Sequence, residues 1–207
     1  HRDLHSFPTR RSSDLITEIA KRDGSVKINN VAYMLNSANL KECFTMLKRG
    51  RAAGIDGVRA EDYETDLEEN LEGLVERLKK QSYRPQPVRR KYIPKANGSM
   101  RPLGIPSVED KVVQTGIARI LEAVYEVDFL DFSYGFRPHR NCHQALDRLD
   151  KILMRRPINH IIDADIKGFF DNVNHGWMKK FLEHRISDPN LLRLIGKIGR
   201  ASCRERV

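Results

Sequence analysis

Apolar residues recur at the spacing of one helical face in three long stretches of the chain. Residues 67–78, 112–124 and 145–153 carry this pattern, and Pro157 ends the third stretch. The pattern is typical of helices that pack one face against a core. Shorter helices are predicted over 39–50 and 177–185. In the three long helices, the side chains expected to point inward are Leu67, Leu71, Leu74, Val75, Leu78, Val112, Val113, Ile117, Ile120, Leu121, Val124, Ala145, Leu146, Leu149, Ile152 and Leu153.

A β-hairpin is predicted between the first two of these helices. Prolines at 85 and 87 end the preceding helix, and residues 88–94 are expected to be extended. Asn97-Gly98 favours a tight turn that returns the chain antiparallel through residues 100–105. Ser107 and Asp110 then resemble a capping pair at the start of the next helix.

Residues 158–166 form an apolar stretch of strand length and predict a buried strand that ends in acids. Helices combined with a hairpin and an isolated buried strand indicate the α+β fold class. No apolar run approaches the roughly 20 residues that a membrane span needs, so we expect no membrane partner. Cys43 and Cys142 are far apart and unpatterned, which fits a reducing cytosol better than a disulfide framework or a zinc site.

The two ends of the chain can be encoded by the two opposite strands of one short DNA sequence. Residues 198–207, IGRASCRERV, can be encoded by a string whose reverse complement translates as HSFPTRRSSD, which is residues 5–14. That string resembles a sequencing-library adapter. We therefore expect residues 1–15 and 198–207 to be adapter-like artefact and exclude them from fold reasoning. The whole chain has a net charge of +9, and without the six arginines and three acids of these ends it is +6. A basic chain suits a polyanionic partner.

Closely set cations distinguish the predicted hairpin, PVRRKYIPKANGSMRPLGIP. Arg89, Arg90, Lys91 and Lys95 lie on one arm and Arg101 on the other. Arginine forks match phosphate oxygens and lysine adds a compact charge, so the hairpin could bind phosphate. The alternative is an ordinary edge hairpin whose charges prevent aggregation.

Carboxylates follow the predicted strand in INHIIDADIKGFFDNVNH. Asp163 and Asp165 are two residues apart and share one face of an extended chain. They could hold Mg²⁺, which prefers oxygen ligands, or they could simply keep the end of a strand soluble. The aromatic and basic loop SYGFRPHRN could stack on bases or be an ordinary structured loop. The glycines of GRAAGIDG could let the backbone approach a phosphate.

In this order, the segments resemble the fingers and early palm of a group II intron-encoded reverse transcriptase. The most specific blocks are YRPQPVRRKYIPKANGSMRPLGIPSVEDKVVQ, SYGFRPHRNCHQAL and DADIKGFFDNVNH. The resemblance covers nearly all of residues 39–197. It implies a right-hand polymerase in which residues 16–157 form the N-terminal extension and fingers, and residues 158–197 begin the palm.

The resemblance also assigns roles to individual residues. Asp165 matches the first catalytic aspartate and metal ligand, with the backbone carbonyl of Ile166 as co-ligand. Phe170 matches the residue under the incoming sugar that discriminates against a 2′-hydroxyl. Lys95 and Arg101 match the fingers cations that grip the dNTP. Asp163 and Asp171 become structural or secondary, and the implied nucleic-acid contacts are Arg89, Arg90, Arg137, Arg140 and the GRAAGIDG loop.

The implied reaction is Mg²⁺-dependent attack of a DNA primer 3′-hydroxyl on the α-phosphate of a dNTP. The implied partners are template RNA, the intron RNA that a maturase helps to splice, primer and dNTP, with a homodimer left open. The implied location is cytoplasmic, associated with a bacterial nucleoid.

One motif of that family is absent from the 207 residues. An aromatic-Ala-Asp-Asp turn supplies the other metal-binding carboxylates in the family, and this chain contains no such sequence. We therefore expect the 207 residues alone to lack polymerase activity. The alternatives that remain open are another bacterial reverse transcriptase, of the CRISPR-associated or diversity-generating kind, a non-catalytic RNA-binding maturase, and a plain phosphate- or RNA-binding module.

Overall fold

The computed structural model describes residues 9–96, 98–169, 172–202 and 205–206. In chain order, its elements are α1 (Thr9–Arg22), the 3₁₀ turn η1 (Ala32–Met34), α2 (Ser37–Thr45), α3 (Ala60–Thr65), α4 (Leu67–Lys79), β1 (Val88–Pro94), β2 (Met100–Ile105), α5 (Val108–Tyr125), the 3₁₀ turn η2 (Glu126–Asp128), α6 (Cys142–Arg155), α7 (His175–Arg185), α8 (Pro189–Ser202) and β3 (Glu205–Arg206). The mixture of helices and strands agrees with the predicted α+β class.

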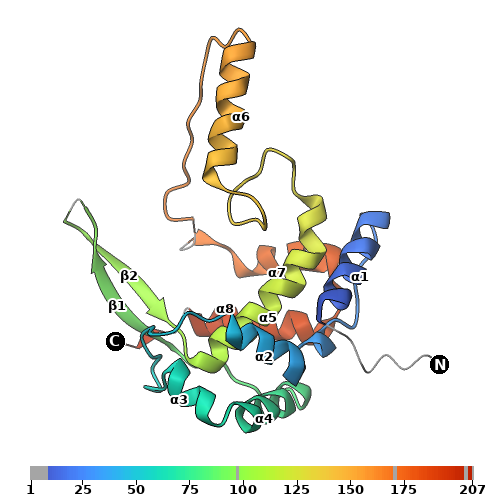
Figure 1. Cartoon of the computed structure of the whole chain (residues 1–207), viewed down its shortest axis with the longest axis vertical. Coiled ribbons are helices and arrows are strands. Elements are labelled where there is room, and N and C mark those ends of the chain that lie inside the picture. The colour runs from blue at the N-terminus through green and yellow to red at the C-terminus, as the bar shows by residue number, and fades with distance from the viewer. Residues whose placement is uncertain (1–8, 97, 170–171, 203–204, 207) are drawn as a thin grey trace.

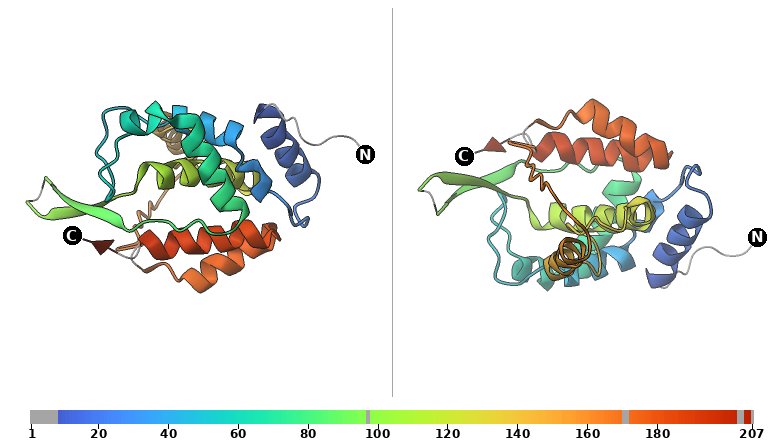
Figure 2. Two further views of the ribbon diagram at one scale, coloured as in Figure 1. Left: turned by 90° about the horizontal axis from the view of Figure 1, so that it is seen from below. Right: turned by 90° about the horizontal axis from the view of Figure 1, so that it is seen from above.

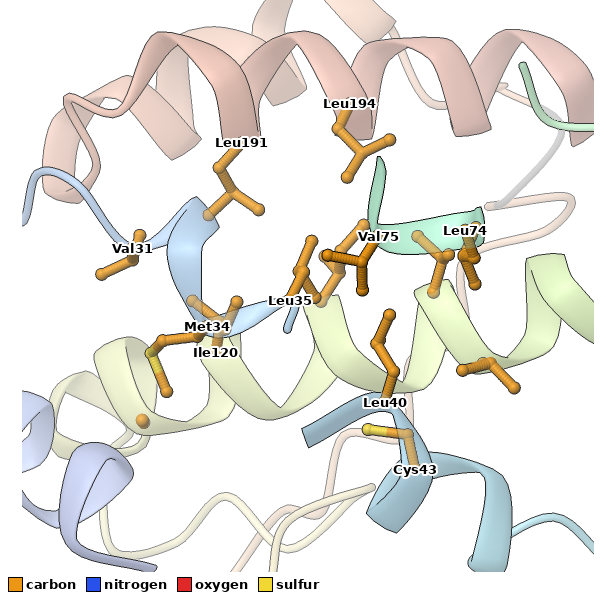
Figure 3. Packing of buried hydrophobic residues seen from close by; sticks show 14 of the residues in the cluster. Val31, Met34, Leu35, Leu40, Cys43, Leu74, Val75, Ile120, Leu191 and Leu194 are labelled. Atoms are coloured by element: carbon orange, nitrogen blue, oxygen red, sulfur yellow. The ribbon is translucent and has the colours of Figure 1, made fainter. Parts of the chain in front are cut away.

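A body of helices surrounds α5, which runs through its middle (Figures 1 and 2). We call α1, α2, α4, α5 and α8, together with η1, the helical body. Its core includes Leu40 and Cys43 of α2, Leu74 of α4 and Ile120 of α5, all at most 1 % exposed (Figure 3). Leu191 of α8 closes the core from another side. The inward faces predicted for 67–78 and 112–124 are confirmed, with Leu67, Leu78 and Leu121 only partly buried.

Two buried side chains join the beginning of the helical body to its end. The carboxylate of Asp188 accepts hydrogen bonds from the backbone N–H groups of Val31 and Ala32, at 2.7 and 2.8 Å. Its other oxygen caps the first turn of α8. Arg185 donates to the carbonyls of Ala20 and Gly24 and lies 3.3 Å from a carboxylate oxygen of Asp128. Segments separated by more than 150 residues are thus joined by hydrogen bonds to buried groups.

The hairpin predicted over 88–105 is confirmed and leaves the helical body as a two-stranded arm (Figure 1). β1 and β2 pair antiparallel from Arg89 opposite Ile105 to Pro94 opposite Met100. Gly98 has φ +79°, a conformation that glycine adopts without strain, whereas Asn97 lies outside the described residues. The predicted cap is also present, since the Ser107 hydroxyl accepts from the N–H of Asp110 at 3.2 Å.

The predicted inward face of 145–153 is wrong, although the helix itself forms. α6 projects away from the helical body (Figure 1), and none of its residues is buried. Leu146 and Leu149 are 61 % and 49 % exposed. The predicted buried strand over 158–166 is also wrong: this segment has no strand partner in the described ranges, and Ile162 is 89 % exposed. A strand needs a hydrogen-bonded neighbour, and the strands that the structure describes pair only with one another. We call residues 142–166 the α6 arm.

The predicted domain limits at residues 15 and 197 stay predictions. α1 spans the first limit and α8 the second, and the partly buried Ile198 packs against the core. β3 pairs in parallel with Val88 and Arg89 of β1.

Candidate nucleotide and nucleic-acid interface

The hairpin separates its cations onto two faces. Directly opposed residues of an antiparallel pair share a face, and neighbours along a strand alternate. Arg89 and Lys91 of β1 therefore share a face with Arg101 of β2, which lies opposite Ile93. All three are exposed, and none of their side chains has an ion pair within the described part of the chain. We call this surface the cation face of the hairpin.

Arg90 lies on the other face of the hairpin. Its guanidinium stacks 5.8 Å from the ring centroid of Tyr92 and donates to the Tyr92 hydroxyl at 3.4 Å. The five cations that the sequence grouped together therefore do not act on one surface. Three converge, and Arg90 points to the opposite side of the same ribbon.

Lys95 follows the end of β1 at the outer end of the hairpin, and its side chain is exposed. Its backbone N–H donates to the Ser99 carbonyl at 2.7 Å and its carbonyl accepts from Gly98 at 3.0 Å. Backbone hydrogen bonds therefore close the turn without using the Lys95 side chain, and its ammonium group remains in solvent. Arg101 lies close to it along the ribbon, because β2 begins at Met100. The structure thus brings Lys95 and Arg101 to the same end of the hairpin.

A buried polar cluster fixes the base of the hairpin to α5. The carboxylate of Asp110 accepts from the Tyr83 hydroxyl and, at 3.0 Å, from the backbone N–H of Gln86. Burial raises the pKa of Asp110, against the opposing effect of these hydrogen bonds. Burial also raises the pKa of Tyr83. The sequence interpretation missed this role, because it took Asp110 only as part of a helix cap.

Arg137 is a buried residue that holds its own loop together. Its guanidinium donates to Glu126, forming an ion pair at 2.8 Å, and to the carbonyls of Leu130 and Ser133 at 2.9 and 2.8 Å. Its side chain is only 6 % exposed. Its donors are therefore directed into the protein, and the structure gives it a positioning role within SYGFRPHRN.

Arg140 lies near the surface of the same loop. Its guanidinium is 3.7 Å from the carboxylate of Asp131 and stacks 5.4 Å from the ring centroid of Tyr134. Phe136 projects fully into solvent with φ +55°. Unlike Arg137, Arg140 keeps part of its surface available to a ligand, so its predicted nucleic-acid contact remains compatible with its position.

Asp165 and Ile166 lie on the exposed extended segment of the α6 arm, with Asp163 two residues earlier. Phe170 and Asp171 lie outside the described residues. Within the described ranges, no three His, Cys, Asp or Glu residues gather in a way that could hold a metal ion. Two carboxylates on an unpaired segment do not make a complete Mg²⁺ site.

The sequence of residues 93–202 matches the family model described as reverse transcriptase (RNA-dependent DNA polymerase). This span contains most of the hairpin, the SYGFRPHRN loop and Asp165. The chain belongs to the reverse transcriptase family. The resemblance inferred from the motifs is thereby confirmed at the level of the family.

The relatives of this reverse transcriptase chain include proteins encoded in introns, one of them a group II intron. It is 36 % identical to the group II intron-encoded protein LtrA of Lactococcus lactis subsp. cremoris over 174 residues, which are 84 % of this chain and 29 % of LtrA. It is 36 % identical to protein YkfC of Escherichia coli K12 over 185 residues, 86 % of this chain and 49 % of YkfC. An uncharacterized 91 kDa protein in the cob intron of Schizosaccharomyces pombe is 32 % identical over 165 residues, 80 % of this chain and 20 % of that protein.

The chain spans less than half the length of each of these relatives. In the part of the chain that the structure describes, no helix is both long and apolar enough to cross a membrane.

Proposed function

We propose that this chain is the fingers and the first part of the palm of a group II intron-encoded RNA-directed DNA polymerase. In the whole protein, the reaction would join a dNTP to a DNA primer along an RNA template, with Mg²⁺ as the metal and Asp165 as one of its ligands. The maturase role, binding of the protein's own intron RNA, belongs to the same proposal. The similarity to LtrA supports it.

The observation that carries the nucleotide-binding part is the pair of exposed cations, Lys95 and Arg101, at the outer end of the hairpin. Arg101 and Lys95 lie together at the outer end of a stiff two-stranded ribbon, and both are exposed. Cations held on a ribbon can neutralise a triphosphate without first giving up a carboxylate partner. Arg90 serves as an internal comparison, since it belongs to the same ribbon but lies on the opposite face, where its guanidinium stacks on Tyr92.

The experiment measures binding of a fluorescent dNTP and of the matching monophosphate to the 207-residue chain. We expect the triphosphate to bind more tightly, and Lys95→Gln combined with Arg101→Gln to weaken it about tenfold, in the range of a lost charge-assisted contact. Arg90→Gln should change triphosphate binding less than twofold. Equal effects of the two variants, or equal affinity for both nucleotides, would reject the proposed dNTP site.

A second measurement concerns catalysis by the chain itself. We expect no primer extension when RNA template, DNA primer, dNTPs and Mg²⁺ are added, because the 207 residues contain no aromatic-Ala-Asp-Asp sequence. One carboxylate cannot hold the two metal ions that such nucleotidyl transfer uses. Extension by the purified chain would overturn this expectation.

A further inference from the structure

The α6 arm, residues 142–166, presents exposed aliphatic side chains along its length. They come from both the helix and the extended segment that follows it: Leu146, Leu149, Ile152, Leu153, Ile158, Ile161, Ile162 and Ile166. The extended segment returns from the outer end of α6 toward α7, outside the helical body (Figure 1). A contiguous exposed apolar surface is typical of an interaction site.

The extended segment also leaves its backbone groups without a strand partner. Residues 158–166 form no ladder and no backbone hydrogen bond within the part of the chain that the structure describes. An extended chain with free N–H and C=O groups readily pairs with a strand of another molecule. A second strand beside this segment would satisfy the backbone groups and bring the isoleucines out of water together.

The sequence of this segment is complementary to itself in one antiparallel register. Successive side chains of an extended chain alternate between its two faces, so Ile158, Ile162 and Ile166 share one face. A two-fold axis at Ile162 would place Ile158 of each copy opposite Ile166 of the other. The axis would also place Ile162 opposite Ile162. The apolar face of one copy is therefore matched by the same face of a second copy, as a two-fold interface requires.

The carboxylates on the other face favour the same register. With the axis at Ile162, Asp163 of each copy lies opposite Ile161 of the other. Asp165 lies opposite Asn159. An axis at Asp163 would instead place Asp163 opposite itself, and like charges directly opposed across two strands are unfavourable. The charges and the isoleucines therefore select the same pairing.

α6 supplies a cover for the paired strands. Two strands alone are only marginally stable in water and gain stability when a helix packs on them. α6 ends at Arg155, immediately before the segment, and none of its residues is buried in the single chain. Its apolar stripe is therefore available to the apolar face that the paired strands would form.

We propose that the α6 arm binds a second copy of this chain. The two segments 158–166 pair antiparallel about Ile162, and the apolar stripes of the two α6 helices pack on the paired strands. This inference gives an interface to the homodimer that the sequence left open. It does not depend on nucleotide binding by Lys95 and Arg101, which lie on the hairpin, so the two proposals fail separately.

The first experiment measures the mass of the 207-residue chain by sedimentation velocity over a series of concentrations. We expect a monomer at the lowest concentrations, with the α6 arm in solvent, that converts to a dimer as concentration rises. Ile162→Glu places two carboxylates opposite each other at the axis and should weaken the dimer about tenfold. A monomer at every concentration, growth beyond the dimer, or an unchanged dimer in the variant would overturn the proposal.

A pair of variants at Ile161 tests the register. Ile161→Lys places an ammonium group opposite Asp163 of the second copy, whereas Ile161→Glu places a carboxylate there. Both remove the same exposed isoleucine and differ only in charge, so each controls for the other. We expect the lysine variant to dimerise about fivefold more tightly than the glutamate variant. The chain has a net charge of +9, so general repulsion between copies would give the opposite order. Equal affinities or that opposite order would overturn the register.

Cross-linking supplies an independent readout of the same geometry. In a chain with Cys142→Ser and Cys203→Ser, Ile162→Cys should form a covalent dimer in oxidised glutathione, because directly opposed Cβ atoms lie about 4.5–5.5 Å apart. His160→Cys is the matched control, since its two copies would lie four residues apart, roughly 13 Å, beyond the reach of a disulfide. Non-reducing gel electrophoresis measures both. Equal cross-linking of the two variants, or none at position 162, would overturn the pairing about Ile162.

Discussion

The helical body and the α6 arm are built from similar sequence patterns but differ in what covers them. α4 and α6 both carry leucines at helical spacing, yet Leu74 of α4 is fully buried whereas Leu149 of α6 is 49 % exposed. α4 packs against α2, and α2 against α5. No described element covers the apolar face of α6.

The difference shows what an amphipathic sequence pattern can predict and what it cannot. Periodicity states which side of a helix is apolar, but it does not state which segment will cover that side. In the helical body the covering segments are present within the described chain. In the α6 arm the apolar face and the extended segment after it remain in solvent, so this region should contribute little to the stability of the chain.

The largest expected effect tests this difference directly. Leu74→Ala removes a fully buried side chain and should lower the free energy of unfolding by about 3 kcal/mol, as large-to-small core changes do. Leu149→Ala should cost less than about 0.5 kcal/mol, because little surface leaves water there. Urea unfolding monitored by circular dichroism gives both values. If the two variants lose similar amounts of unfolding free energy, α6 is packed in solution and the contrast between the helical body and the α6 arm is wrong.

A smaller effect is expected where the backbone of the helical body packs most closely. Gly54→Ala places a methyl group against the backbone of Ser107 and Pro106 and should destabilise the chain by about 2 kcal/mol, as overpacking does. Gly135→Ala, in the loop that leads to α6, has no atom within 4 Å of the added carbon. Its thermal midpoint should stay close to that of wild type, and a large drop there would show contacts absent from this structure.

The smallest effect concerns the junction between the helical body and the hairpin. Asp110→Asn keeps the shape of the side chain and removes its charge, so it should cost about 1 kcal/mol through weaker hydrogen bonds. Burial raises the pKa of Asp110 in the folded chain. The protonated form is therefore favoured by folding, and this contribution is complete below the ordinary aspartate pKa and is lost as pH rises through the higher folded value.

The stability advantage of wild type over Asp110→Asn should accordingly shrink as pH increases from about 4, near the ordinary aspartate pKa. Unfolding of both proteins across that range measures the difference. An advantage that grows with pH would show that the hydrogen bonds from Tyr83 and Gln86 outweigh burial. The sign of the pH dependence therefore decides between the two causes.

Local signals predicted much of the secondary structure. The apolar spacing over 67–78 predicted α4, and the capping pair that begins with Ser107 predicted the start of α5. Both signals depend only on residues within one or two helical turns. The Asn97-Gly98 sequence predicted the hairpin, because a tight turn also depends only on neighbouring residues. Segment 158–166 could not be predicted, because its conformation depends on whether a distant strand lies beside it.

The candidate site was less predictable than the fold. Alternation along a strand separates Arg90 from Arg101 only once the pairing register is known. Arg137 looked like a surface cation, but its partner Glu126 lies eleven residues earlier in a different element. The carboxylate of Asp110 accepts a hydrogen bond from the hydroxyl of Tyr83, which lies 27 residues earlier in the chain. A sequence motif names these side chains, whereas their partners depend on tertiary packing.

The hydrogen bonds between Asp188 and residues 31–32 have a consequence for how the chain is made. These partners are 157 and 156 positions apart, so the N–H groups of Val31 and Ala32 cannot reach this acceptor until the start of α8 has been synthesised. At ordinary translation rates of about 5–20 residues per second, the wait is roughly 8–30 seconds. During that interval the N–H groups of Val31 and Ala32 must form their hydrogen bonds with water on the growing ribosomal chain. Residues 31 and 32 therefore reach their final hydrogen bonding late, after α1, α2, α4 and α5 have all been synthesised.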